Sequence, residues 1–144
     1  MSQVNLEKFI KAQQHDFDVA LSEIKNGRKQ SHWMWYIFPQ IHGLGFSETS
    51  KFYSIKSIEE AEAFLNDPVL GPRLIEISNA LLGLNKKDAN KVFGSPDDLK
   101  LQSSMTLFSS LSNSNPVFQQ VLDQYFGGKK DKKTLQILNE ENER

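Results

Sequence analysis

The stretch NPVFQQVLDQYFG, residues 115–127, shows how this chain is built. It opens with an asparagine and a proline, which are favoured at a helix cap and at the first helical position. Apolar residues then recur every three or four positions, the spacing of one helix face. Gly127 closes the stretch and suits the left-handed residue that follows many helices. These residues predict an amphipathic helix with both ends marked.

Other helix starts of the same kind occur along the chain. Asp67-Pro68 and Ser95-Pro96 each place a capping side chain before a proline, and Ser57 with Glu60 forms a capping box. Apolar residues at helical spacing follow each of them. No run of β-branched residues alternates with polar ones, so the sequence contains no convincing strand.

The two ends of the chain also predict helices. Candidate caps at Asn5 and Asp16 predict two separate N-terminal pieces, and Asp131 is a candidate cap for a last helix that frays into a polar tail at residues 139–144. The predicted fold is therefore all-α, a compact bundle of about six to eight helices, some short, with one loop rich in glycine and aromatic residues.

Length and composition restrict the class of protein. The 144 residues suit a single domain, residues 1–144 with a core at about 5–138, and the absence of cysteine excludes disulfides and thiolate metal sites. The net charge of −1 makes nucleic acid an unlikely partner. The longest apolar run, residues 33–38, is too short to span a membrane. We expect a cytoplasmic protein with no metal and no cofactor.

Residues 31–40, SHWMWYIFPQ, depart from a plain helical pattern. Trp33 and Trp35 are two positions apart, so on a helix their rings point roughly 200° from each other. One ring would then enter the core while Trp35 lines a cleft, with His32 at the helix start. The alternative is that the apolar residues are all core and that His32 is only a polar residue at a helix N-terminus.

Two further segments suggest a ligand site. Gly43 and Gly45 precede a candidate cap at Ser47, where backbone N–H groups would approach an anion, although a structural turn explains the same glycines. Farther along, four polar residues share or adjoin one face of a predicted helix, and they form either a solvated surface or the wall of a pocket. These residues are Asp97, Lys100, Ser103 and Thr106.

Four blocks of this sequence resemble the family catalogued as domain of unknown function 1810. The blocks are residues 31–40, 43–45, 68–74 and 93–108, and the likeness extends from about Leu6 to Leu138. The resemblance implies a mainly α-helical single domain and supplies no activity. Separately, Asn115-Pro116-Val117-Phe118 with Leu122 is similar to a short segment of NADAR-type domains, which process ADP-ribose derivatives; a helix start explains these residues equally well.

These features lead to two hypotheses about function. In the first, the protein has a pocket, with or without an enzymatic activity, for a small anionic or nucleotide-like ligand similar to ADP-ribose. Trp35 would stack on a ring, Gly43, Gly45, Lys100, Ser103 and Thr106 would bind the ligand, and His32 or Asp97 would be the general acid or base. In the second, exposed aromatic residues such as Trp35, Tyr36 and Phe46 form a non-catalytic protein–protein interaction module.

Overall fold

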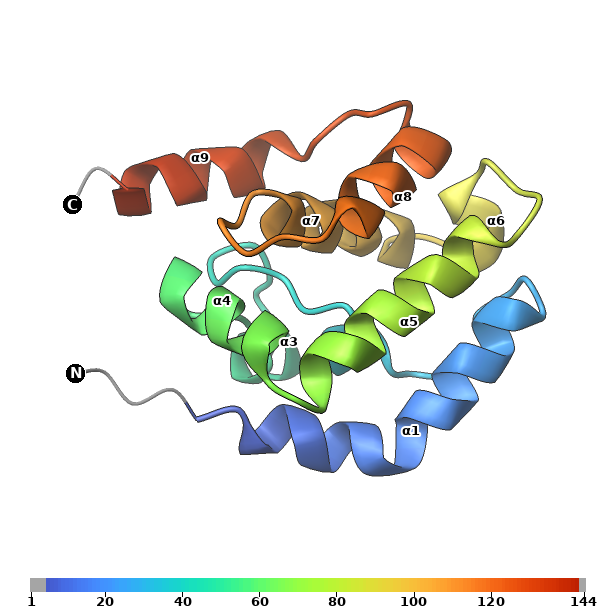
Figure 1. The fold of residues 1–144 in the computed structure, drawn as a ribbon, viewed down its shortest axis with the longest axis horizontal. Helices are drawn as coiled ribbons and strands as arrows, with labels where there is room; N and C mark the ends of the chain where they lie inside the picture. Colours follow the sequence, from blue (N-terminus) through green and yellow to red (C-terminus); the bar gives the residue numbers. More distant parts are fainter. Residues whose placement is uncertain (1–4, 143–144) are drawn as a thin grey trace.

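The computed structural model describes residues 5–142, which form nine α-helices joined by short connections (Figure 1). Six of these helices have at least nine residues, and the other three have four or five. Their bounds are α1 Glu7–Lys25, α2 Met34–Ile37, α3 Glu48–Phe52, α4 Ile58–Asn66, α5 Leu70–Leu82, α6 Ala89–Phe93, α7 Asp97–Ser109, α8 Pro116–Phe126 and α9 Lys132–Asn142. The prediction of an all-α fold with several short helices is confirmed.

Helix α7 is the centre of the molecule. It packs against α6, α8 and α9, while α5 contacts α1, α4 and α8 (Figure 1). Residues 103–108 are all buried, so α7 has no face exposed to water along this part of its length. The hydroxyl groups of Ser103 and Thr106 donate back to the helix, to the carbonyls of Leu99 at 3.1 Å and of Gln102 at 2.8 Å. The face predicted from its polar residues is therefore largely internal.

Helix α1 is one continuous helix, so the prediction of two N-terminal pieces is wrong. Gln13 interrupts the row of apolar residues on the buried face of α1, and this polar side chain is itself buried. Its side-chain amide donates a hydrogen bond of 2.8 Å to the carbonyl of Tyr36. A buried polar group with a hydrogen-bond partner is tolerated in a core, and α1 thereby stays bonded to α2.

Several predicted helix ends are confirmed. Asn115 accepts a hydrogen bond from the backbone N–H of Val117, Ser57 accepts one from Glu60, and Gly127 adopts φ +61° after α8. The start predicted at Pro96 is wrong by one residue, because α7 begins at Asp97 and has no side-chain cap. At the other end of the chain, α9 extends through Asn142, farther than predicted, and Glu141 accepts a hydrogen bond of 2.7 Å from the N–H of Ile58.

The glycine- and aromatic-rich segment is mostly buried in its aromatic half, from Trp33 to Ile41. It is held by a short parallel bridge between Ile41 and Ile55, with hydrogen bonds from Ile55 to the carbonyl of Gln40 and from His42 to that of Ile55. Trp33 and Phe38 are buried and pack with Phe93 at centroid distances of 5.9 to 6.3 Å. None of the helices among residues 5–142 combines the length and apolarity that crossing a membrane requires.

Candidate functional site

Lys100 is the point at which the predicted site residues meet. Its ammonium lies 5.2 Å from the ring centroid of Trp35 and 3.5 Å from Oδ1 of Asp97. The other carboxylate oxygen of Asp97 pairs with Lys29 at 3.0 Å, and the Lys29 ammonium lies 5.3 Å from the ring centroid of Trp33. One carboxylate thus connects two lysines, each of which covers an indole ring. We call these five residues the lysine–tryptophan cluster.

The ion pairs of this cluster are shielded from water. The side chains of Lys29, Asp97 and Lys100 are only 9%, 19% and 22% exposed. Fully exposed ion pairs contribute little because water screens them and the side chains stay mobile. Partial burial and contact with a ring reduce both effects. The Lys100 ammonium is therefore held in one place before any ligand arrives.

The segment that carries the two tryptophans is anchored to α1 by Glu23. The Glu23 carboxylate accepts hydrogen bonds from the N–H groups of Gln30 and Ser31, from the Ser31 hydroxyl and from Nε1 of Trp33, at 2.5 to 3.0 Å. Burial raises the pKa of Glu23, but these hydrogen bonds outweigh it, so the pKa lies below its ordinary value. Glu23 therefore stays charged and fixes the start of the aromatic block.

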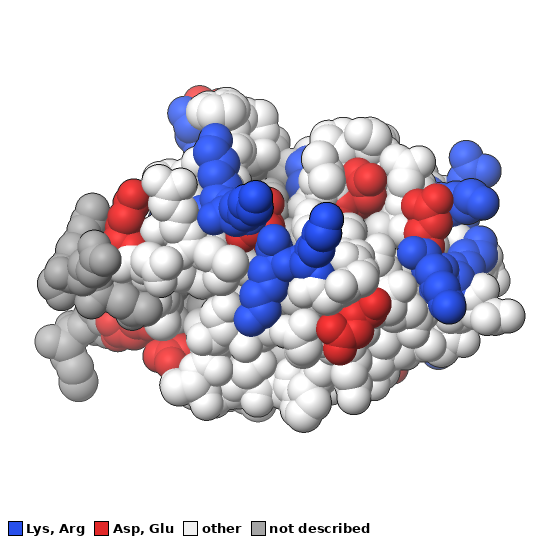
Figure 2. Space-filling model, turned by 90° about the horizontal axis from the view of Figure 1, so that it is seen from above, with Lys and Arg blue, Asp and Glu red and all other residues white. Residues whose placement is uncertain are grey.

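A hollow of about 230 Å³ lies beside Lys100, and we call it the Lys100 hollow. Its walls come from the loop before α3, from α3 itself, from the N-terminal half of α7 and from the start of α9. The lining residues are Gln40, Leu44, Gly45, Ser50, Pro96, Leu99, Lys100, Ser103, Asp131 and Lys133. Seen from above Figure 1, basic side chains gather over the middle of the visible face of the molecule, with carboxylates between them (Figure 2).

Three groups in the Lys100 hollow are available to bind an anion. Lys100 and the exposed Lys133 each contribute an ammonium, and the side-chain amide of Gln40 has no hydrogen bond to another residue within 5–142. Asp131 also lines the hollow, but one of its carboxylate oxygens caps α9 by accepting from the N–H and hydroxyl of Thr134. Lys29, Lys100 and Lys133 bring three positive charges to this region, against the two carboxylates of Asp97 and Asp131, and the net positive charge favours a negatively charged ligand.

The hydroxyl groups predicted to bind ligand are already occupied. Ser103 lines the hollow but donates its proton to the carbonyl of Leu99, so it offers only acceptor lone pairs. Thr106 is buried outside the hollow, donates to the carbonyl of Gln102 at 2.8 Å and accepts from the N–H of Asp131 at 2.9 Å. Thr106 therefore positions the start of α9, and with it Lys133.

The two predicted glycines occupy different places. Gly45 lines the Lys100 hollow, and a Cβ at this position would lie 2.5 Å from Cβ of Ser50, closer than two such atoms can approach. Gly43 has φ +109°, which favours glycine, and it does not line the hollow. Both glycines thus have a structural reason to be where they are.

His32 lies apart from this hollow. Its side chain is exposed and makes no hydrogen bond to another residue in the described part of the chain, while its carbonyl accepts one from the Tyr36 hydroxyl at 3.2 Å. The structure brings together five of the eight predicted residues around Lys100 and leaves three elsewhere. The five are Trp35, Gly45, Asp97, Lys100 and Ser103; the three are His32, Gly43 and Thr106.

Sequence reasoning missed four polar residues of the hollow, Gln40, Ser50, Asp131 and Lys133. Gln40 ends the aromatic block, and Asp131 and Lys133 belong to the lysine-rich run at residues 129–133, which reads as a solvated connection. The lysines of this run indicate local positive charge, but nothing in the sequence shows which part of the fold they lie against. Within the described residues, no group of three or more histidine, aspartate or glutamate side chains is placed to hold a metal ion.

Comparison with known proteins supports the predicted family. A family described as "Protein of unknown function (DUF1810)" matches residues 3–138. The chain belongs to this family. Its fold is similar to the crystal structure of the conserved hypothetical protein Rv1873 from Mycobacterium tuberculosis, with 42% identity, a TM-score of 0.90, and coverage of 93% of this chain and 96% of that chain. The curated proteins include no match.

The family therefore supplies a fold without an activity. Three of the four sequence blocks from which membership was predicted contribute all five of the predicted residues that meet around Lys100. Any statement about what the DUF1810 fold does in this chain depends on the chemistry of the hollow.

Proposed function

We propose that the Lys100 hollow binds a small anion, either free or as the phosphoryl group of a nucleotide-like ligand such as ADP-ribose. The observation that carries this proposal is the convergence of Lys100, Lys133 and the free amide of Gln40 from three separate parts of the chain. Ammonium groups and an amide N–H are the donors that phosphoryl oxygens accept most readily.

The size of the hollow limits what enters it. Its volume of about 230 Å³ is below the range of cavities that enclose whole drug-sized ligands. It accommodates one anionic group, and the remainder of a larger ligand would extend over the rim. Leu44 and the exposed Leu99 form an apolar part of that rim. A free anion and a nucleotide-like ligand therefore share the same anchoring chemistry.

In this proposal Asp97 is a positioning residue for Lys100. Both of its oxygens are engaged in ion pairs, and it lies beside the hollow without lining it. His32 is outside the hollow and receives no role. The proposal is thus one of binding, and it assigns no reaction to the site.

The alternative is a non-catalytic interaction module. Phe46 favours it, because this side chain is 82% exposed, far more than a large apolar residue usually is. The other predicted anchors support it less: Tyr36 is buried, and the ring of Trp35 is covered by Lys100. We therefore retain the anion site as the primary proposal and Phe46 as the test residue for the alternative.

The experiment is calorimetric titration of the whole protein with inorganic phosphate and with ADP-ribose. We expect saturable binding of phosphate that Lys100→Gln weakens about tenfold, because a charge-assisted hydrogen bond contributes about 1.5–3 kcal/mol. Lys133→Gln should weaken it less, because that side chain is exposed. Tighter binding of ADP-ribose than of phosphate would identify the larger ligand class.

Two control variants make the result interpretable. Lys25→Gln removes the same charge from an exposed position on α1, outside the hollow, and should leave the affinity unchanged. Phe46→Ser should also leave phosphate binding unchanged. The proposal fails if neither ligand binds saturably or if Lys100→Gln and Lys25→Gln behave alike. Loss of self-association or of partner binding in Phe46→Ser alone would instead support the interaction module.

A further inference from the structure

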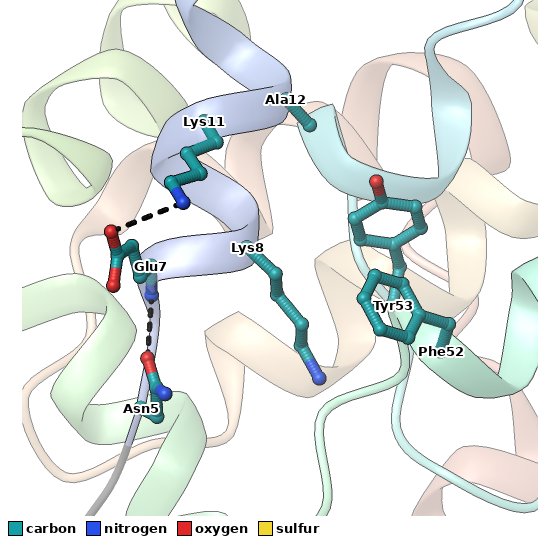
Figure 3. Close-up of a pocket in the computed structure, with 7 residues that line it drawn as sticks. All are labelled: Asn5, Glu7, Lys8, Lys11, Ala12, Phe52 and Tyr53. Carbon is teal, nitrogen blue, oxygen red and sulfur yellow. Dashed lines mark hydrogen bonds and ion pairs between the residues drawn. The ribbon is translucent and has the colours of Figure 1, made fainter.

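A second and larger hollow lies on another part of the molecule (Figure 3). Its volume is about 690 Å³, within the range of ligand cavities, and it shares no lining residue with the Lys100 hollow. The first turns of α1 form one side and the end of α3 the other. The lining residues are Asn5, Glu7, Lys8, Lys11, Ala12, Phe52 and Tyr53. We call it the Phe52 hollow.

One wall of the Phe52 hollow is a pair of aromatic rings. The rings of Phe52 and Tyr53 meet edge to face at a centroid distance of 4.8 Å. Tyr53 is fixed from behind by Phe9 at 5.9 Å and Tyr36 at 5.1 Å, whereas Phe52 is 56% exposed. The wall is thus an apolar surface supported by the core and open to water, on which a planar ring would bury area.

The opposite wall supplies positive charge. Lys8 extends from α1 toward the two rings, and its ammonium lies 5.1 Å from the centroid of Phe52 (Figure 3). Within residues 5–142, no carboxylate lies within ion-pair distance of Lys8. Lys11 pairs with Glu7 at 3.4 Å instead, and both of those side chains are largely exposed. Lys8 is therefore the uncompensated cation of the hollow.

The neighbourhood of Lys8 is positive beyond its own charge. Burial and the charge of Lys8 together lower the pKa of Lys56, although Glu60 acts in the opposite direction. Lys56 donates hydrogen bonds to the carbonyl of Lys51 at 2.7 Å and to Ser54 at 2.8 Å, which keeps it near this site. Two like charges placed close together attract an anion more strongly than either would alone.

We propose that the Phe52 hollow binds a small aromatic anion, with its ring against Phe52 and its carboxylate or sulfonate at Lys8. The exposed part of the Phe52 ring contacts the ligand ring, and the adjacent Lys8 ammonium, which lies over the same ring at 5.1 Å, pairs with the ligand charge. A ligand with only one of the two features therefore binds more weakly. This proposal is independent of the anion site at Lys100.

The test is titration of the whole ¹⁵N-labelled protein with 2-naphthoate, followed by amide chemical shifts. The matched probes are 2-naphthalenemethanol, which keeps the ring without the charge, and acetate, which keeps the charge without the ring. We expect naphthoate to shift the amides of Lys8, Ala12, Phe52 and Tyr53. Naphthoate should bind about fivefold more tightly than the alcohol, because its carboxylate adds an ion pair with Lys8 beside an aromatic ring. Acetate should leave these amides unshifted.

Variants separate the contributions of the two walls. Lys8→Gln should reduce the affinity for naphthoate about fivefold, to that of the alcohol, and leave the alcohol unaffected. Phe52→Leu keeps an apolar side chain at an exposed position and should weaken both naphthyl probes about threefold. Lys25→Gln is the charge control on the same helix and should change neither. Intact amide spectra of each variant establish that it is folded.

Three outcomes would overturn this proposal. The first is that naphthoate shifts amides elsewhere or none at all. The second is that naphthoate and the alcohol bind equally well, and the third is that Lys8→Gln binds naphthoate as the parent protein does. Failure of phosphate binding at Lys100 would not affect this result, because the two hollows have separate walls.

Discussion

At the scale of single residues, two polar side chains of α1, the buried Gln13 and the half-buried Glu23, determine how the aromatic block is held. Gln13 and Glu23 on α1 supply hydrogen bonds to Tyr36, Ser31 and Trp33. The sequence indicates that the aromatic residues are core, because they are large and apolar. It does not indicate the partners of Gln13 and Glu23, because a polar residue on an amphipathic helix normally faces water.

Tyr36 gives a pH-dependent test at this scale. Its hydroxyl donates a short hydrogen bond to the carboxylate of Asp16, and burial together with Asp16 raises the pKa of Tyr36 well above its ordinary value. We expect Tyr36→Phe to lower the free energy of unfolding by about 1–2 kcal/mol at pH 7, because a partly buried hydrogen bond to a carboxylate is lost. Urea unfolding followed by circular dichroism measures this difference.

The sign of the pH effect follows from proton binding. Above about pH 10 a tyrosine in the unfolded chain loses its proton, while Tyr36 in the folded protein keeps it. The folded state then binds more protons, so the stabilisation from Tyr36 is complete below that pH and declines as the pH rises. The difference in free energy of unfolding between the parent protein and Tyr36→Phe should therefore decrease between pH 9 and 11. A difference that stays constant over this range would contradict the raised pKa of Tyr36.

At the scale of elements, several helix caps were predictable, but the starts of α5 and α7 and the continuity of α1 were not. Asn115, Ser57 and Gly127 act as their local sequence indicates, because a cap depends on two or three neighbouring residues. In the unbroken α1, the carboxylate of Asp16, the predicted cap, accepts a hydrogen bond from the distant Tyr36 hydroxyl. The close approach of α4 and α5 is another feature that only the fold reveals.

Gly71 tests this approach. A Cβ at Gly71 would lie 2.1 Å from the carbonyl oxygen of Leu65, a backbone atom that cannot move aside without displacing α4. We expect Gly71→Ala to lower the free energy of unfolding by about 1–3 kcal/mol, the usual cost of overpacking.

Gly83 is the matched control for this prediction. It follows the same helix with φ −72°, and a Cβ there would meet nothing closer than 3.4 Å. Gly83→Ala should be neutral or stabilising by up to about 1 kcal/mol, because alanine restricts the unfolded chain. Equal effects of the two substitutions in thermal unfolding would show that the α4–α5 contact is looser than the structure indicates.

At the scale of the whole molecule, charge is distributed unevenly although the total is close to zero. The net charge of −1 argues against a general attraction to anions, yet Lys100 and Lys133 meet in one hollow from positions far apart in the chain. The predicted residues Trp35, Asp97 and Lys100 could be identified from helix spacing and residue type. Lys133 could not, because only the docking of α9 on α7 brings it there.

The central claim is that these separate segments form one anion site, and an amide chemical-shift titration of the whole protein with inorganic phosphate tests it most directly. We predict that the amides of Gln40, Lys100 and Lys133 shift together with a single apparent Kd, and that Lys100→Gln weakens all three responses alike. Shifts confined to one of these segments, or spread over unrelated lysines such as Lys25, would contradict the account.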